Sequence, residues 1–179
     1  MISLRSKVTQ KVLAFLFLNN EEFYARELAR RLDLPHGNLI KKLHELERLG
    51  LLISEQRGQE KYYKLNNKFP LLKEYKKIVN QSFGFEERLK ETLLKTNGIE
   101  KAILFGSYVT KKMERYSDID LIVIGNHSII TLQKNISKLQ KEFNREINVI
   151  NMSNTEFKQK RIKDTFLKRV FSSPIIEVI

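Results

Sequence analysis

Apolar residues recur at helical spacing along the first fifty positions. Val8, Val12, Phe15 and Leu16 follow one face of a predicted first helix. A second helix is predicted over 23–32 and a third over 38–49, with a tight turn at 34–37 between them. The third helix has an apolar stripe that we expect to be buried, formed by Leu39, Leu43, Leu46 and Leu49.

The pattern then changes from helical to extended. Gly50 stands where a glycine commonly follows the last turn of a helix. Residues 51–54 and 61–65 predict two strands, and residues 55–60 predict the polar connection between them. Three helices followed by a hairpin therefore occupy the front of the chain.

A polar break at 66–70, which contains Pro70, separates this region from the rest. Helices are predicted over 71–79 and 85–94, and either could pack against another domain or pair two subunits. Strands are predicted over 101–105, 121–124 and 146–150, with a helix marked by Leu132, Ile136, Leu139 and Phe143 before the last of them. Ser153 and Glu156 form a capping box that opens a basic helix through about 170, and an edge strand is predicted over 175–179.

The segment from 101 to 125 carries the candidate chemistry. Gly106 and Ser107 directly follow a predicted strand, and a Gly-Ser turn offers backbone N–H groups and a hydroxyl to a phosphate. Ser117, a further candidate contact with the nucleotide, precedes Asp118 and Asp120. The two carboxylates at i and i+2 on a strand point to one face and could bind Mg²⁺. Further candidates for contact with a triphosphate lie between the two motifs, at Lys111 and Lys112.

These motifs (GSY at 106–108, SDIDLIVIG at 117–125 and REINVI at 145–150) resemble those of the minimal nucleotidyltransferases, which share the fold of DNA polymerase beta. The resemblance implies an α+β domain over 98–179, with a mixed sheet flanked by helices, that binds a nucleoside triphosphate with Mg²⁺. It also places Asp118 and Asp120 as catalytic and metal-binding residues.

The phrase ARELARRLDLPHGNLIKKLHELERLGLL resembles prokaryotic winged helix-turn-helix transcriptional regulators. The resemblance implies a DNA-binding domain over 1–66, joined to the second domain by linker helices over 67–97. In such folds the helix after the turn enters the major groove, and the hairpin and second helix meet phosphates. The predicted DNA contacts are Arg30, Arg31, His36, Asn38, Lys41, Lys42, Arg57 and Lys61. Charges opposite a leucine stripe are also compatible with a solvated helix face in a docking module.

Active members of the nucleotidyltransferase superfamily use a third carboxylate on a neighbouring strand. The resemblance places Asn148 there, as a third metal ligand that carries no charge and cannot accept a proton. Glu146 lies two residues earlier and could replace it if the strand were shifted.

Composition adds two constraints. The 179 residues carry 33 Lys and Arg against 21 Asp and Glu, a net charge of +12 that is typical of proteins with polyanionic partners. The charge is positive on both sides of Asn80, so it does not by itself locate a nucleic-acid site. There is no cysteine, no predicted signal peptide and no membrane-spanning run, and we expect a cytoplasmic protein.

Three functions remain open from the sequence. The first is a transcriptional regulator that binds double-stranded DNA and whose second domain has a nucleotidyltransferase fold and binds a nucleotide with Mg²⁺. The second is a transferase that moves a nucleoside monophosphate from a triphosphate to a hydroxyl, in a toxin–antitoxin pair with a partner protein. The third is a non-catalytic interaction scaffold. A homodimer would suit a helix-turn-helix protein that binds a two-fold operator.

Overall fold

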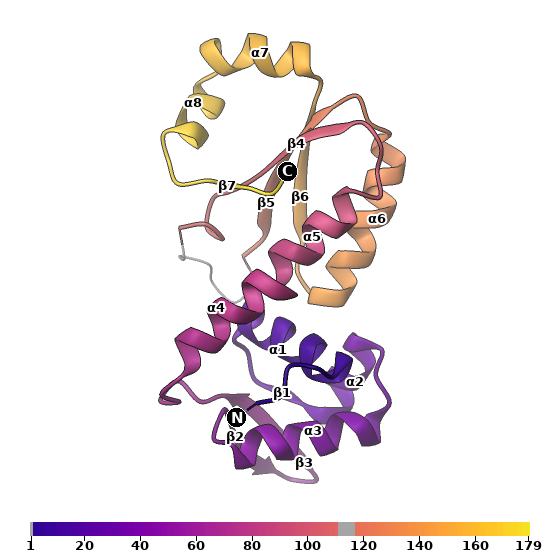
Figure 1. Cartoon of the computed structure of the whole chain (residues 1–179), viewed down its shortest axis with the longest axis vertical. Helices are drawn as coiled ribbons and strands as arrows, with labels where there is room; N and C mark the ends of the chain where they lie inside the picture. Colours follow the sequence, from indigo (N-terminus) through magenta and orange to yellow (C-terminus); the bar gives the residue numbers. More distant parts are fainter. Residues whose placement is uncertain (1, 111–116) are drawn as a thin grey trace. The chain divides into compact units, whose positions relative to one another are not determined.

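A computed structural model describes residues 2–110 and 117–179 of the chain. The chain divides into two compact units, Met1–Glu87 and Arg88–Ile179, which are described separately below (Figure 1). Within the described residues, no helix is both long enough and apolar enough to cross a lipid bilayer.

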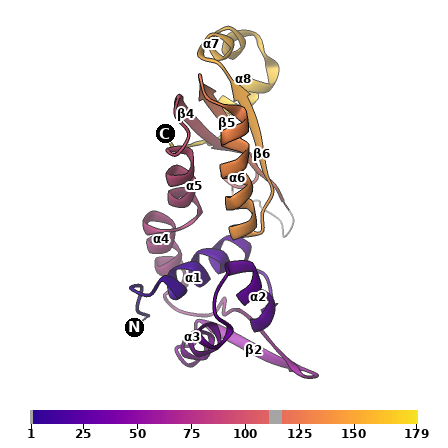
Figure 2. The same ribbon diagram turned by 90° about the vertical axis from the view of Figure 1, so that its right-hand side faces the viewer.

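The N-terminal unit contains three helices followed by a hairpin, in the predicted order. Its elements are α1 (Lys7–Asn19), β1 (Phe23–Tyr24), α2 (Ala25–Leu32), α3 (His36–Arg48), β2 (Leu52–Arg57), β3 (Glu60–Leu65) and α4 (Leu72–Ser82). The strands form an antiparallel sheet in the order β1-β3-β2. Figure 2 shows α3 nearly end on, beside β2 of this unit.

Leucines and aromatic residues from α1, α2 and α3 form the core of this unit, and Leu39, Leu43 and Leu46 of α3 are fully buried. Leu49 was predicted to complete that stripe, but it lies at the C-cap of α3 and is 37% exposed. Gly50 follows with φ +79°, a conformation that favours glycine, which confirms the predicted helix end.

Two other predictions for this unit were wrong in detail. Residues 23 and 24 do not begin a helix, because Phe23 and Tyr24 pair with Tyr63 and Tyr62 as the short strand β1. The connection predicted over 55–60 is shorter, because Glu55, Gln56 and Arg57 continue β2 and pair with residues of β3.

In α4, Tyr75 and Val79 are buried while Ile78 is 45% exposed.

The C-terminal unit is built on a four-stranded mixed sheet in the order β6-β5-β4-β7. Its elements are α5 (Phe85–Leu93), which begins just before the unit boundary, β4 (Ile99–Phe105), β5 (Ile119–Gly125), α6 (Ile129–Phe143), β6 (Ile147–Met152), α7 (Asn154–Lys163), α8 (Thr165–Phe171) and β7 (Ile176–Glu177). β5 runs parallel to β6 and antiparallel to β4, and β7 pairs with β4.

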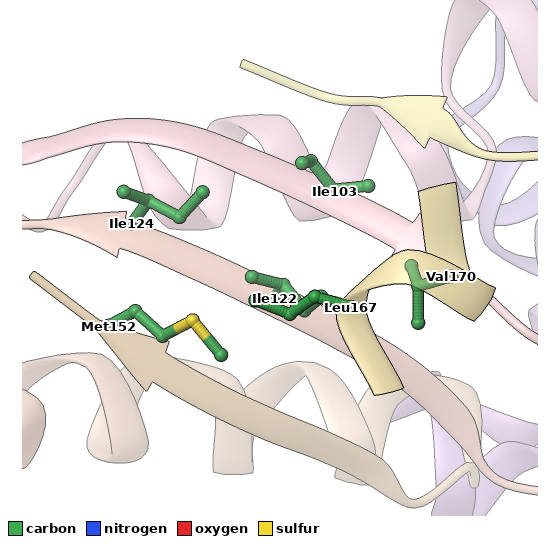
Figure 3. Packing of buried hydrophobic residues seen from close by; sticks show 6 residues of the cluster. All are labelled: Ile103, Ile122, Ile124, Met152, Leu167 and Val170. Carbon is green, nitrogen blue, oxygen red and sulfur yellow. The ribbon is translucent and has the colours of Figure 1, made fainter. Parts of the chain in front are cut away.

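Helices cover the two faces of this sheet. On one face, Ile103, Ile122, Ile124 and Met152 of the strands pack with Leu167 and Val170 of α8 (Figure 3). The opposite face carries the alternate strand residues, and α5 and α6 lie behind the sheet in Figure 3. Four residues of α6 are buried, at the positions predicted from its periodicity: Leu132, Ile136, Leu139 and Phe143.

The basic helix predicted from Ser153 to about Val170 is two helices. The Ser153 side chain accepts a hydrogen bond from Glu156 N, as the capping box predicts. Asp164 then leaves the helical conformation and its carboxylate accepts bonds from Phe166 N and Leu167 N, which ends α7 and caps α8.

Candidate functional site

The predicted phosphate-binding turn lies at the end of β4. Gly106 has φ +76°, and the chain then makes a single turn closed by Thr110, whose N donates to Gly106 O at 3.2 Å. A Cβ added to Gly106 would lie 2.5 Å from Asp120 Oδ2, so only glycine allows the turn to approach that carboxylate. Ser107 follows directly and is half-buried.

Asp120 lies at the start of β5, beside that turn, and Asp118 directly precedes the strand. Asp120 pairs with Phe105 on β4, so the two motifs that are well separated in sequence meet at one end of the sheet. Because side chains alternate along a strand, the spacing of two residues places both carboxylates on the face of Ile122 and Ile124. Asp118 is exposed and Asp120 is half-buried.

The surroundings of Asp120 disfavour its charged form. Burial raises the pKa of Asp120 above the ordinary 3.8, and the negative charge of Asp118 adds to the rise. The Asn148 amide acts in the opposite direction, because a hydrogen-bond donor lowers the pKa of the carboxylate it faces. A cation bound here would favour the charged form in the same way.

Asn148 is the residue of β6 that lies opposite Asp120 in the parallel register. Its Nδ2 donates a hydrogen bond to Asp118 Oδ2 at 3.2 Å. The ladder runs in register from Ile119–Ile147 to Ile124–Met152, so the structure gives no sign of the strand shift that would bring Glu146 into this place. Glu146 is exposed before β6 begins.

Oxygen ligands dominate this donor set, which suits Mg²⁺. Two carboxylates and one amide oxygen are available at Asp118, Asp120 and Asn148, and each lies on the same end of neighbouring strands. Within the described ranges, no group of three or more His, Cys, Asp and Glu could hold a metal ion. The site therefore offers Mg²⁺ two negatively charged carboxylates and one neutral amide oxygen. Because Mg²⁺ prefers oxygen ligands, these three side chains fit the ion.

Arg145 is a residue of this region that the sequence did not single out. It is 6% exposed, and its Nη1 donates to Ser117 O at 3.3 Å. This contact joins the start of β6 to the residue directly before Asp118. An arginine between a helix and a strand looks like a solvent-exposed residue in sequence, so no local pattern could have identified it.

Ser117, a predicted nucleotide contact, is half-buried next to the carboxylates. The other two predicted contacts with a triphosphate, Lys111 and Lys112, lie outside the described residues.

Half of the predicted DNA contacts are held in ion pairs within the N-terminal unit. Arg31 pairs with Glu21 and Glu27, and Lys42 pairs with Glu45 at 2.5 Å. On the hairpin, Arg57 pairs with Glu22 and Glu55, each at 2.6 Å, and Lys61 pairs with Glu47 at 2.8 Å.

The other half is exposed at the surface of α2 and the first turns of α3, at Arg30, His36, Asn38 and Lys41. None of the four has a hydrogen bond or ion pair through its side chain to the part of the chain that the structure describes. His44 and Arg48 continue the exposed face of α3 one and two turns beyond Lys41, and the sequence analysis missed both.

Comparison with protein families matches residues 87–170 to the family described as "Polymerase beta, Nucleotidyltransferase". No curated protein matches the chain. Three solved structures are similar to it. The crystal structure of a toxin–antitoxin with AMP-PNP has 20% identity and a TM-score of 0.40, and the alignment covers 52% of this chain and 72% of that one.

The second is a candidate nucleotidyltransferase from Sulfolobus solfataricus, with 19% identity, a TM-score of 0.30, and coverage of 44% of this chain and 70% of that one. The third is TrmBL2, an archaeal chromatin protein that binds DNA, with 16% identity, a TM-score of 0.30, and coverage of 92% and 72%. The family match coincides with the sheet that carries Gly106, Asp118 and Asp120. Residues 87–170 thus match a nucleotidyltransferase domain, and the mixed sheet of the C-terminal unit with its flanking helices fits that fold.

Proposed function

We propose that the protein is a DNA-binding regulator whose C-terminal unit binds a nucleotide together with Mg²⁺. The observation that carries the nucleotide half is the close approach of Gly106 to Asp120, which brings a phosphate-binding turn against a pair of carboxylates. Phosphate oxygens and carboxylates are both negatively charged and repel each other. A divalent cation bound between them would remove this repulsion and stabilise the bound nucleotide.

Each residue has a defined part in this proposal. The backbone and hydroxyl of Ser107 would hold a phosphate, with Ser117 nearby, and the carboxylates of Asp118 and Asp120 would hold the cation. Asn148 would contribute its amide oxygen, which requires its side chain to turn from the donor contact with Asp118. Mg²⁺ would neutralise phosphate charge at this site.

A binding role suits the third ligand better than rapid transfer does. Asn148 adds no charge for the metal and cannot take a proton from an attacking hydroxyl. Loss of such a group typically costs several kcal/mol of transition-state stabilisation, on the order of a thousandfold in rate. The transferase function expected as an alternative therefore remains a second proposal, supported by the fold of the unit.

Calorimetry with each nucleoside triphosphate, with and without Mg²⁺, tests the nucleotide half. We expect binding to require Mg²⁺ and to be lost in Asp118→Asn/Asp120→Asn. Glu146→Gln is the matched control, because it removes an exposed carboxylate two residues from Asn148 and should leave binding unchanged. Unchanged binding in the double variant would refute the site, and incubation with labelled triphosphates and cell lysate would reveal any transfer.

The DNA half of the proposal rests on the N-terminal unit. Its order of helices and hairpin is that of winged helix-turn-helix domains, in which the N-terminal residues of the third helix meet base edges. Here those residues are His36, Asn38 and Lys41, and they are exposed. Asn38 would pair with an adenine edge and Lys41 with guanine or a phosphate.

The ion pairs divide the predicted contacts into two groups. Arg30 and Lys41 are available to DNA without breaking an ion pair among the described residues, whereas Arg31, Arg57 and Lys61 would have to leave their carboxylate partners. We therefore assign the main phosphate and base contacts to the exposed group, and extend it along α3 to His44 and Arg48.

Selection from a pool of random duplexes, followed by gel shifts at several salt concentrations, tests this half. Arg30→Ala/Lys41→Ala should weaken binding and reduce the salt slope by about 2, because each neutralised phosphate contributes about 0.9. The control Lys73→Ala/Lys77→Ala removes the same charge from exposed positions of α4. Equal effects of the two variants would refute the assignment of the contacts to α2 and α3.

A further inference from the structure

The excess of positive charge in the C-terminal unit is concentrated in α7 and α8. Between Ser153 and Ser173 the chain has six lysines and arginines and two carboxylates. Both carboxylates are already engaged, since Glu156 pairs with Lys160 at 2.6 Å and Asp164 caps α8. The surface therefore carries cations that its own acids do not compensate.

Four of these cations are exposed and have no carboxylate partner among the residues that the structure describes: Lys158, Lys163, Lys168 and Arg169. Arg161 is placed differently, because its guanidinium lies 5.8 Å from the ring centroid of Phe157 and 5.0 Å from that of Phe171. It is thus held at the junction of the two helices. By contrast, Lys101 elsewhere in the same unit pairs with Glu177 at 2.9 Å.

α7 contributes little to the core. None of its residues is buried, although Phe157 packs partly against the apolar cluster, and Ile162 is 73% exposed. A helix that lies on a lipid surface needs a continuous apolar face, and α7 has only these two large apolar residues. The chemistry of its surface therefore favours a polyanion in water over an anionic membrane.

We propose that the exposed cations of α7 and α8, Lys158, Lys163, Lys168 and Arg169, bind the phosphate backbone of a nucleic acid. This is a second nucleic-acid surface, on a different unit from the α3 face, and it does not depend on either half of the proposed function. The ten residues of α7 are about 15 Å long, and a nucleic-acid strand presents a phosphate roughly every 3.4 Å of its axis. α7 is thus long enough to span several phosphates at once.

Backbone contacts of this kind carry no base sequence. The surface should therefore bind single strands without sequence preference and with a strong dependence on salt. Each phosphate neutralised on a single strand contributes about 0.7 to the slope of log affinity against log salt, so four contacts contribute about 3.

The test is fluorescence anisotropy of the full chain with a labelled single-stranded oligonucleotide of about twenty nucleotides, titrated at several salt concentrations. In Lys158→Gln/Lys163→Gln/Lys168→Gln/Arg169→Gln, we expect the salt slope to fall by about 3 and affinity at low salt to fall more than about tenfold. The pair Lys158→Gln/Lys163→Gln should give about half of that fall in slope, and it serves if the fourfold variant does not fold.

The matched control is Lys90→Gln/Lys95→Gln/Lys134→Gln/Lys138→Gln, which removes the same charge from exposed positions of the same unit outside α7 and α8. It should change affinity less than about threefold. Equal losses in the two fourfold variants would show that only net charge matters and would overturn the proposal.

Two further measurements decide the chemistry of the contact. Lys158→Arg/Lys163→Arg/Lys168→Arg keeps every charge and should retain affinity; a loss would contradict an electrostatic backbone contact. Sedimentation with vesicles that contain phosphatidylserine tests the competing partner. If the fourfold variant lost vesicle binding and kept oligonucleotide binding, the surface would belong to a membrane and the proposal would be wrong.

Discussion

Asn148 donates a hydrogen bond through Nδ2 to Oδ2 of Asp118, at 3.2 Å, from the strand position that lies opposite Asp120. A neutral donor in this place reduces the repulsion between the two carboxylates without any metal. The same residue, turned over, would present an oxygen to a cation. Asn148 therefore suits a site that is stable both with and without Mg²⁺, whereas a third carboxylate would make stability depend on the ion.

The first prediction concerns this residue. Asn148→Asp should lower the thermal stability of the metal-free protein, because three carboxylates then meet at one end of the sheet. Mg²⁺ should raise the melting temperature of this variant more than that of the native chain, since an ion bound only to the folded state stabilises it. Thermal melts with and without Mg²⁺ provide the measurement, and Asn148→Ala controls for loss of the amide. Equal Mg²⁺ effects in all three proteins would contradict the proposed ligand.

The second prediction follows from the raised pKa of Asp120. The pKa of Asp120 is higher in the folded protein than its value of about 3.9 in the unfolded chain. The charged carboxylate therefore lowers the free energy of unfolding at neutral pH. This cost disappears at low pH, where Asp120 is protonated in both the folded and the unfolded state. Asp120→Asn should therefore increase the free energy of unfolding near pH 7, and the gain should shrink as the pH falls to about 3. Urea unfolding across this range measures it. A gain that is independent of pH would mean that charge is not its cause.

The third prediction compares two glycines. Gly106→Ala should destabilise the protein by about 1–2 kcal/mol or more and abolish nucleotide binding, because its φ is positive and the new Cβ would meet Asp120. Gly37→Ala is the matched control. It lies inside α3, and an added Cβ meets nothing within 4 Å, so alanine should stabilise the unit by up to about 1 kcal/mol.

Urea unfolding and calorimetry measure both glycine variants. A Gly106→Ala protein that binds nucleotide with native affinity would disprove the role of the close approach. Gel shifts with Gly37→Ala add a separate result, since His36 and Asn38 flank this glycine on the proposed DNA-binding face.

The fourth prediction concerns the contact between α3 and the hairpin. Glu47 accepts hydrogen bonds from Ser54 on β2 and Lys61 on β3, and the bond from Lys61 is the main cause of its lowered pKa. The charged form of Glu47 therefore stabilises the fold at pH values above 4.5, the ordinary pKa of a glutamate. This stabilisation is lost as the pH falls through the pKa that Glu47 has in the folded protein. Because the pair is partly exposed, Glu47→Gln should cost about 1 kcal/mol or less near pH 7 and nothing at low pH. Glu60→Gln, on the same hairpin, is the control, and a larger loss there would contradict the assignment.

Local sequence signals predicted most of the fold. Helical spacing identified α1, α3 and α6, and the positive φ of Gly50 agrees with its predicted place at the helix end. Two predicted helix boundaries were wrong, because one depends on a single polar side chain and the other on pairing with a distant strand. Asp164 splits the basic helix by capping α8, and Phe23 joins a sheet whose partner strand lies forty residues away.

The candidate site likewise has residues that the local sequence predicts and residues whose contacts depend on distant parts of the chain. Gly106, Asp118 and Asp120 lie in motifs that can be read locally, and their meeting follows from the pairing of β4 with β5. The ion pair between Arg57 and Glu22 joins residues 35 positions apart, so nothing in the local sequence shows which predicted DNA contacts are already occupied. The burial of Arg145 likewise depends on the packing of β6 beside β5.

The place of Asn148 also bears on how the activity of such a protein could evolve. The Asn148 side chain is exposed at the sheet end, so the core does not restrict what stands there. Asparagine and aspartate are exchanged by the smallest step that the genetic code allows. A lineage with this scaffold could therefore gain or lose a catalytic acid without refolding, and switch between sensing a nucleotide and consuming it.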